Sequence, residues 1–301
     1  MSSVEPSRLR LGIYLAFGLA TFALAPILVR FAGDVHPVSL AVIRTVSAVI
    51  IILPFWLKSR IQQKFEPWGT RETVLAFLAG TFLALHFIFW IASLSYTSVA
   101  SASVLVTIHP VILIVTESLL RTNRYGAITW GGVILAFSGS ALLGIFDTDA
   151  AVTYSNPMLG NGMAFLAAVL FVGYILLSRS LRSHASWLDF VFRVYAGTAI
   201  TCVIIFFVMG LSLKIAPIAI VCGLLLGIGP QLIGHGSINY SVKYISPTLL
   251  STLILTEPVF AIILAAFLFN EIPTLAESSA MFVIIVGVGI SWIGGIKFGS
   301  K

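Results

Sequence analysis

The sequence predicts an all-α membrane protein whose ten transmembrane helices form two inverted five-helix repeats. Three observations predict this fold: an apolar composition, long stretches without charge, and a duplication of the chain at a fixed offset. Of the 301 residues, 59% are hydrophobic and only 9% are charged, a composition typical of integral membrane proteins. The basic residues behind the net charge of +6 are scattered among short loops, so nucleic acid is not expected as a partner.

Charge-free stretches locate the helices. A helix needs about 20 mostly apolar residues to cross a bilayer. The 44-residue stretch 73–116 contains no charged residue, so it must hold two helices with a turn near residues 93–97. We expect ten helices near 11–30, 37–57, 72–92, 97–118, 127–146, 159–178, 187–209, 215–237, 245–269 and 277–296.

The loop charges predict the orientation in the membrane. With loops assigned alternately to two sides, thirteen Lys and Arg residues share the side of the N-terminus, and two, Arg30 and Lys214, lie opposite. The thirteen are Arg8, Arg10, Lys58, Arg60, Lys64, Arg71, Arg121, Arg124, Arg179, Arg182, Lys243, Lys297 and Lys301. Because basic loops stay on the cytoplasmic side, we expect a multi-pass protein of the inner (plasma) membrane with both termini in the cytoplasm.

One pattern occurs twice in the chain. At an offset of 148 residues, segment 105–112 aligns with segment 253–260, and His109 falls on Glu257. Further along, polar and aromatic positions match in the same register, which chance matches between two apolar segments rarely produce. We therefore interpret the pattern as a true internal duplication.

The duplication predicts two halves, residues 1–148 and 149–301, each with five helices. One extra residue in the seventh helix changes the offset to 149 and brings Arg44 onto Arg193. Because five is odd, the second half enters the membrane from the opposite side. Such inverted repeats are typical of secondary transporters, whose sites lie near the membrane midplane between the repeats.

These features resemble the EamA-type, ten-helix transporters of the drug/metabolite transporter superfamily. The motifs are Arg44, Arg193, Pro110-Val111, Glu257-Pro258-Val259-Phe260, Phe269-Asn270-Glu271 and the Gly-Val-Gly-Ile run at 287–290. Two positions depart from the family pattern, because Asn270 stands where Gly is usual and segment 122–124 lacks the acidic residue. The resemblance covers essentially the whole chain and implies export of amino acids and related metabolites across a bacterial inner membrane.

Glu257 and His109 are the first candidate site residues. An ionisable group in the middle of a membrane is expensive and by default functional, and the inverted repeat places both groups at similar depth. Glu257 is expected either to carry a proton or a substrate ammonium, or to bond backbone groups freed by Pro258. The two side chains either pair directly or each face the cavity.

A polar stripe marks the eighth helix. Gly227, Gln231, His235 and Asn239 recur every four residues and share one helical face, with Pro230 as an expected kink. Polar side chains in a membrane must meet protein or water. The stripe therefore either lines a cavity or forms hydrogen bonds between helices.

Two further pairs have alternative readings. His86 and Trp90 lie one turn apart on the third helix, where they either pack or line a site, and Trp90 also suits an interfacial anchor. Arg44 and Arg193 either have a structural role or bind a substrate carboxylate, which suits a guanidinium group. Glu117 is expected to form an ordinary ion pair with Arg121 and to have no function.

Stripes of small residues mark the fifth and tenth helices. Spacing of four lets helix backbones approach closely, so we expect these two helices to form a scaffold or the surface of a homodimer. The stripes are Gly132, Ala136, Ser140 and Gly144, and Gly287, Ser291 and Gly295.

The sequence therefore predicts a secondary transporter, with a small-molecule substrate and an exporter as the leading direction. Proton coupling, a facilitative uniporter or channel, and an importer remain alternatives. An enzyme is not expected, because the chain contains no His-Glu-x-x-His, no Gly-x-Ser-x-Gly and no paired aspartates on facing helices. The chain also contains no P-loop, so ATP is not expected to drive transport directly. Cys202 and Cys222 offer neither metal spacing nor a disulfide framework, so no metal and no cofactor are expected.

Overall fold

The computed structural model describes residues 7–62, 67–97, 99–146, 155–183, 185–257, 259–260, 263–264, 267 and 273–298. Within these residues the protein is entirely helical. Grouped by continuity, the helices make ten transmembrane segments, which confirms the predicted fold class. Eight of the described helices are long and apolar enough to cross a membrane.

The first half holds five segments, two of them broken. The bounds are α1 (Arg8–Phe22) followed by α2 (Leu24–Phe31), α3 (Pro37–Ile61), α4 (Thr70–Ser93), α5 (Val99–Val106) followed by α6 (His109–Leu119), and α7 (Ala127–Phe146). The predicted turn near 93–97 is observed between α4 and α5.

The second half follows the same plan, shares the break in its fourth segment, and has a further break in its third segment instead of its first. The bounds are α8 (Pro157–Arg182), α9 (Trp187–Val208), α10 (Pro217–Leu226) followed by the π-helix η2 (Gly227–His235) and α11 (Gly236–Ser241), α12 (Pro247–Ile254), and α14 (Leu275–Phe298). The ninth segment continues beyond α12 into Glu257, Val259 and Phe260, and its later residues are only partly described.

Local sequence signals explain where several helices begin. Pro37, Pro157, Pro217 and Pro247 each occupy the first turn of their helix, where the missing backbone N–H is not needed. The side chain of Ser186 caps α9 by accepting from the backbone N–H of the third residue of that helix, 3.3 Å away.

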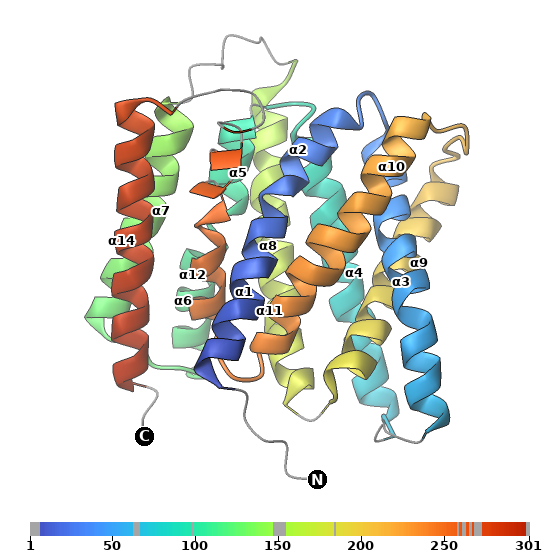
Figure 1. Cartoon of the computed structure of the whole chain (residues 1–301), viewed down its shortest axis with the longest axis horizontal. Helices are drawn as coiled ribbons and strands as arrows, with labels where there is room; N and C mark the ends of the chain where they lie inside the picture. The colour runs from blue at the N-terminus through green and yellow to red at the C-terminus, as the bar shows by residue number, and fades with distance from the viewer. Residues whose placement is uncertain are drawn as a thin grey trace.

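The two halves run in opposite directions through the molecule. Figure 1 shows α1 rising from the end where both termini lie, whereas α8 starts at the opposite end and descends. The core lies where α4 packs against α8 and α9. Phe87, Phe171, Tyr174 and Tyr195 are buried there.

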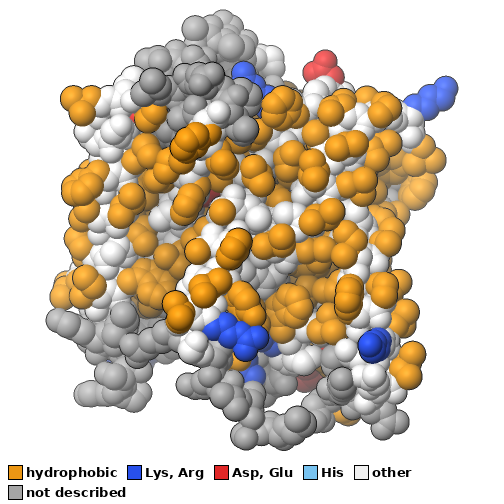
Figure 2. Space-filling view, in the orientation of Figure 1, with side chains coloured by type: hydrophobic (Ala, Val, Ile, Leu, Met, Phe, Trp, Pro, Cys, Tyr) orange, Lys and Arg blue, Asp and Glu red, His pale blue; other side chains and the backbone are white. Residues whose placement is uncertain are grey.

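The outer surface matches a bilayer. Figure 2 shows hydrophobic side chains covering the middle of one face, with Lys and Arg side chains near its two ends. Exposed residues such as Phe17, Ile134 and Phe207 belong to this apolar surface, and they have lipid rather than water as a favourable neighbour.

The small-residue stripes of α7 and α14 pack against each other. A Cβ atom at Gly132 would collide with the backbone of Ser291, and one at Gly287 would collide with that of Ala136. The scaffold role expected for these helices is therefore observed within one chain. A homodimer would have to use other faces of α7 and α14, because the glycine faces already bury each other.

Candidate functional site

A small cavity lies between the two halves. Its volume is about 60 Å³, room for only about four to six water molecules. Both halves contribute to its wall. The lining residues are Phe22, Ala25, Arg44, His86, Phe87, Trp90, Ser103, Val106, Thr107, His109, Phe171, His235, Ile254 and Glu257.

The cavity lies where two segments interrupt their helices. Thr107 and Ile108 separate α5 from α6, and a turn at Leu255 and Thr256 follows α12. The predicted kink at Pro258 lies outside the described residues, and the interruption in the structure precedes it. Broken helices at the midplane are typical of substrate sites in transporters built from inverted repeats.

These breaks bring His109 and Glu257 to one cavity, as the repeat predicted. His109 begins α6, and its ring packs on Phe171 with 4.6 Å between centroids. Glu257 follows the second turn and is partly exposed. Although both side chains are described, no hydrogen bond or ion pair joins them, so the direct pairing held open by the sequence is not observed.

Arg44, on α3, supplies the cation of the cavity. The side chain is only 2% exposed, its Nε donates to Gln231 Oε1 at 3.0 Å, and its guanidinium carbon lies 3.6 Å from the centre of the Phe87 ring. Among the described residues, the ion pair found joins Arg193 to Asp189 and leaves Arg44 without a carboxylate in contact. A buried charge without a counter-ion is expensive, and an anionic ligand group would offset that cost.

Three histidines surround the same space. The Nδ1 atom of His86 lies 2.9 Å from the carbonyl oxygen of Ala167, so this nitrogen carries the proton and donates. The ring of His235 stands edge-on to Phe22 with 4.9 Å between centroids. The Nδ1 atoms of His109 and His235 are buried without a hydrogen-bond partner among the described residues. The described side chains form no cluster of metal-ligand spacing.

Comparison with known proteins identifies the fold and its class. A model of the EamA-like transporter family matches the chain twice, over residues 10–145 and 158–293. The chain belongs to the EamA-like transporter family. The uncharacterized transporter YxxF of Bacillus subtilis (strain 168) is 22% identical over 263 residues, which cover 84% of this chain and 80% of that protein.

A solved crystal structure supports the same fold. It is 17% identical, has a TM-score of 0.79, and covers 98% of this chain and 100% of that one. The EamA-like transporter is therefore a multi-pass membrane protein that moves a small-molecule substrate and is not an enzyme. The division at residue 148 falls outside the described residues and stays a prediction.

Of the predicted site residues, six line the cavity of this EamA-like transporter, and three do not. The six are Arg44, His86, Trp90, His109, His235 and Glu257. The three others are Gln231, Asn239 and Arg193, which form contacts elsewhere in the protein.

The polar stripe of the eighth segment is not a single cavity face. His235 lines the cavity, whereas Gln231 lies behind Arg44 and Asn239 accepts from the Tyr174 hydroxyl at 2.6 Å. The stripe was predicted from α-helical spacing, but η2 is π-helical. Its backbone hydrogen bonds join residues five apart instead of four, which changes the angle between successive side chains around the helix axis. Of the polar residues in the stripe, His235 alone lines the cavity.

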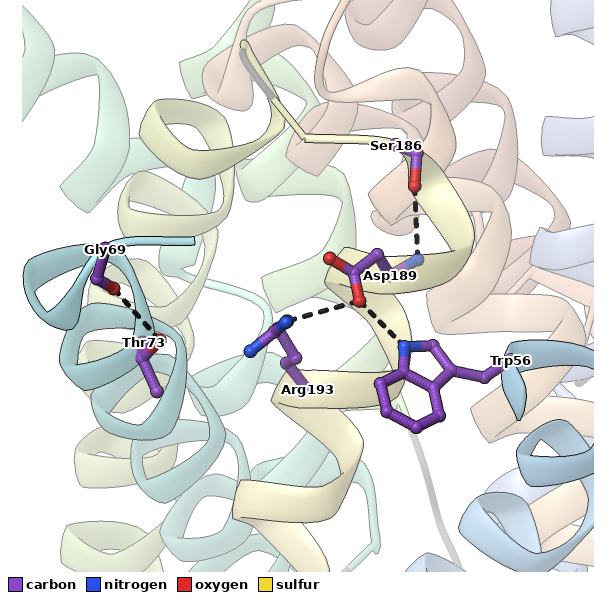
Figure 3. A network of polar contacts seen from close by, with 6 residues as sticks. All are labelled: Trp56, Gly69, Thr73, Ser186, Asp189 and Arg193. Atoms are coloured by element: carbon purple, nitrogen blue, oxygen red, sulfur yellow. Dashed lines mark hydrogen bonds and ion pairs between the residues drawn. The ribbon is translucent and has the colours of Figure 1, made fainter. Parts of the chain in front are cut away.

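Arg193 lies in a polar network near the start of α9 (Figure 3). Its Nε is 3.2 Å from Asp189 Oδ1, and the same oxygen accepts from the Trp56 indole at 2.7 Å. The guanidinium also lies 4.6 Å from the centre of the Trp68 ring. The structural reading of Arg193 is the one that these contacts support.

Sequence reasoning missed several polar groups. Ser103 lines the cavity, and its match with Ser251 in the repeat was a usable signal. Asp189 lies four residues before Arg193, a spacing typical of helical ion pairs. The expected ion pair between Glu117 and Arg121 is wrong, because the Glu117 carboxylate is buried and accepts hydrogen bonds from α12.

Proposed function

We propose that this transporter is a secondary exporter of small zwitterionic metabolites such as amino acids, with the cavity as its substrate site. The observation that carries the proposal is a pair of opposite charges, Arg44 and Glu257, on one cavity wall without an ion pair between them. A guanidinium binds a substrate carboxylate well, and the Glu257 carboxylate in the same cavity suits an ammonium.

The size of the cavity supports alternating access. Ligand pockets are commonly about 300 Å³ or larger, so a cavity of about 60 Å³ must widen before it admits an amino acid. The interrupted helices on both sides of the cavity are the parts that such a rearrangement would move. This conformation then corresponds to a closed or nearly closed stage of the cycle.

Countertransport in proteoliposomes tests the function. Vesicles preloaded with one amino acid should accumulate the labelled amino acid from outside, which a carrier does and a channel does not. A panel of amino acids should be compared with simple carboxylates, which lack the ammonium group, and simple amines, which lack the carboxylate. This comparison would identify the substrate class. If no zwitterion exchanges while a single-charge compound does, the zwitterion proposal is wrong.

Glu257→Gln tests proton coupling by Glu257. The amide keeps the size of the side chain and removes its charge. We expect exchange to fall about tenfold, as for loss of a hydrogen bond to a charged group, and its pH dependence to disappear. Glu277→Gln, in an exposed cap of α14, is the matched control. Wild-type rate and pH dependence in Glu257→Gln would make Glu257 a purely structural residue.

The proposed export direction rests on the family resemblance, and we propose separately that the protein lies in a bacterial inner membrane with both termini in the cytoplasm. The loop charges support this orientation. Reporter fusions at Asp147 should be accessible from outside, and fusions at Gln62 only after permeabilisation. The reverse pattern would contradict the orientation.

A further inference from the structure

A buried carboxylate joins the two halves at the end of the molecule that holds the termini. Glu117 is 1% exposed. Its Oε2 accepts from the Thr248 backbone N–H at 3.1 Å, from the Thr248 hydroxyl, and from the Tyr125 hydroxyl at 2.7 Å. Its Oε1 accepts from the amide of Asn123. Four donors surround the carboxylate, and no cation of the described residues forms an ion pair with it.

The local sequence builds this cluster. After α6, Arg121 takes a left-handed backbone conformation with φ of 54°, and this turn brings Asn123 and Tyr125 back beside Glu117. Across the interface, Thr248 lies in the first turn of α12. The first turn of a helix leaves backbone N–H groups unpaired, and its partial positive charge stabilises a carboxylate.

The cluster lies between the cavity and the end of the molecule that holds the termini. Glu117 follows His109 by eight residues along α6, about 12 Å at the α-helical rise, and Thr248 precedes Glu257 by a similar length of chain. The ends of α6 and α12 that carry the cluster point toward the termini in Figure 1. Between the cluster and the cavity, Leu113 and Leu250 are buried in the apolar core, together with Ile254 on the cavity wall.

The opposite end has no sequence counterpart of this cluster. At the 148-residue offset, Glu117 falls on Ala265 and Thr248 falls on Ala100. An inverted repeat exchanges its two ends when it changes conformation. The hydrogen bonds between the repeats are therefore available to stabilise closure at the end of the termini and not closure at the other end.

We infer that Glu117 is a gating residue of the transport cycle, whose bonds to Thr248 and Tyr125 hold the termini end of the cavity closed. For the cavity to open toward the termini, α6 and α12 must separate there, and the carboxylate must release Thr248. Loss of the bonds shifts the population toward the state that is open at this end. The inference rests on the proposal that the cavity is the transport site.

A single cysteine on the cavity wall tests the gate without a known substrate. Val106→Cys, with Cys202 and Cys222 replaced by Ala, is labelled by a membrane-impermeant maleimide from each side of sealed vesicles. A tag on the N-terminus reports which side is exposed. In Glu117→Gln we expect labelling from the termini side to accelerate roughly tenfold, as for one lost hydrogen bond to a charged group, and labelling from the other side to slow down.

Two milder variants and one control complete the experiment. Tyr125→Phe and Thr248→Val each remove one donor and should shift labelling in the same direction by less. Thr116→Val makes the same change one residue before the gate, where the hydroxyl bonds only to the Ile112 carbonyl of its own helix at 2.7 Å. This control should label as the wild type does.

The outcomes separate the gate from the substrate site. If folded Glu117→Gln labels at the wild-type rate from both sides, Glu117 only caps α12 and the gate is wrong. If that variant does not fold, the labelling rates of Tyr125→Phe and Thr248→Val decide instead, and wild-type rates from both sides in these two variants would contradict the gate. A cysteine at Val106 that never reacts from either side would overturn the proposed cavity as well.

Discussion

The two halves of the molecule carry an arginine at matching positions, and the two arginines have different surroundings. Arg44 is buried on the cavity wall against the neutral Gln231 amide and the Phe87 ring. Arg193 is 21% exposed near the start of α9 and is paired with Asp189. The sequence difference is one turn away, because the position that corresponds to Asp189 in the first half is the apolar Leu40.

This difference teaches that a duplicated residue need not keep a duplicated role. The partner decides whether the charge is neutralised within the protein or remains available to a ligand. In the first half no carboxylate of the described residues is in contact with the guanidinium, which leaves its charge available to a ligand. In the second half Asp189 pairs with it. The pair His109 and Glu257 diverges further, since one repeat presents an imidazole and the other a carboxylate to the same cavity.

The strongest test replaces both arginines in parallel. Arg44→Gln should lower amino-acid exchange in proteoliposomes by roughly 10- to 100-fold, the range for losing a hydrogen bond to a charged group. Arg193→Gln should leave exchange near the wild-type rate and lower the free energy of unfolding by roughly 3 kcal/mol, because it leaves the buried Asp189 carboxylate without its cation. Equal losses of exchange in two folded variants would show that the halves are functionally equivalent here.

A second test gives Arg44 the environment of Arg193. Gln231→Glu places a carboxylate beside the guanidinium, as Asp189 lies beside Arg193. The new ion pair should compete with a substrate carboxylate and raise KM about tenfold, as for the loss of one charged hydrogen bond, while kcat changes less. Asp189→Asn is the matched control, and it should alter thermal stability without altering KM. An unchanged KM in Gln231→Glu would remove Arg44 from substrate binding.

Much of the fold was predictable because the bilayer imposes simple rules. Charge-free lengths located the ten segments, and the match of His109 with Glu257 revealed the duplication. The cavity wall was predictable where an ionisable residue stands alone in an apolar segment, as with His86 and Glu257, and Trp90 followed from its position one turn after His86.

The remainder depended on geometry that the sequence does not display. The π-helix η2 changes which side chains share a face, so Gln231 and Asn239 do not line the cavity with His235 as the predicted stripe required. Glu117 looked like a surface residue because Arg121 follows at helical spacing. The left-handed turn at Arg121 and the packing of α6 on α12 bury the carboxylate instead. The turn is a backbone conformation that helical spacing does not predict, and the packing joins residues that are distant in sequence.

The smallest expected effect concerns the loop that follows the fourth transmembrane segment of each half. Tyr125 in this loop of the first half corresponds to Pro273 in the second. Burial first, and the Glu117 carboxylate next, raise the pKa of the Tyr125 hydroxyl above its ordinary value of 10.0. A raised pKa contributes stability that is fully present below the unfolded pKa and is lost as pH rises toward the folded value. Stability should therefore decline as pH rises above about 10.

Thermal unfolding of the purified transporter as a function of pH measures this contribution. The melting temperature of the wild type should fall more steeply above about pH 10 than that of Tyr125→Phe, because the variant has no hydroxyl to ionise. Tyr240→Phe is the matched control, since Tyr240 lies at the same end of the molecule but is partly exposed. This control should follow the wild-type curve. Parallel curves for Tyr125→Phe and the wild type would mean that the first-half cluster adds no stability through Tyr125, and the gate would then depend on Thr248 and Asn123.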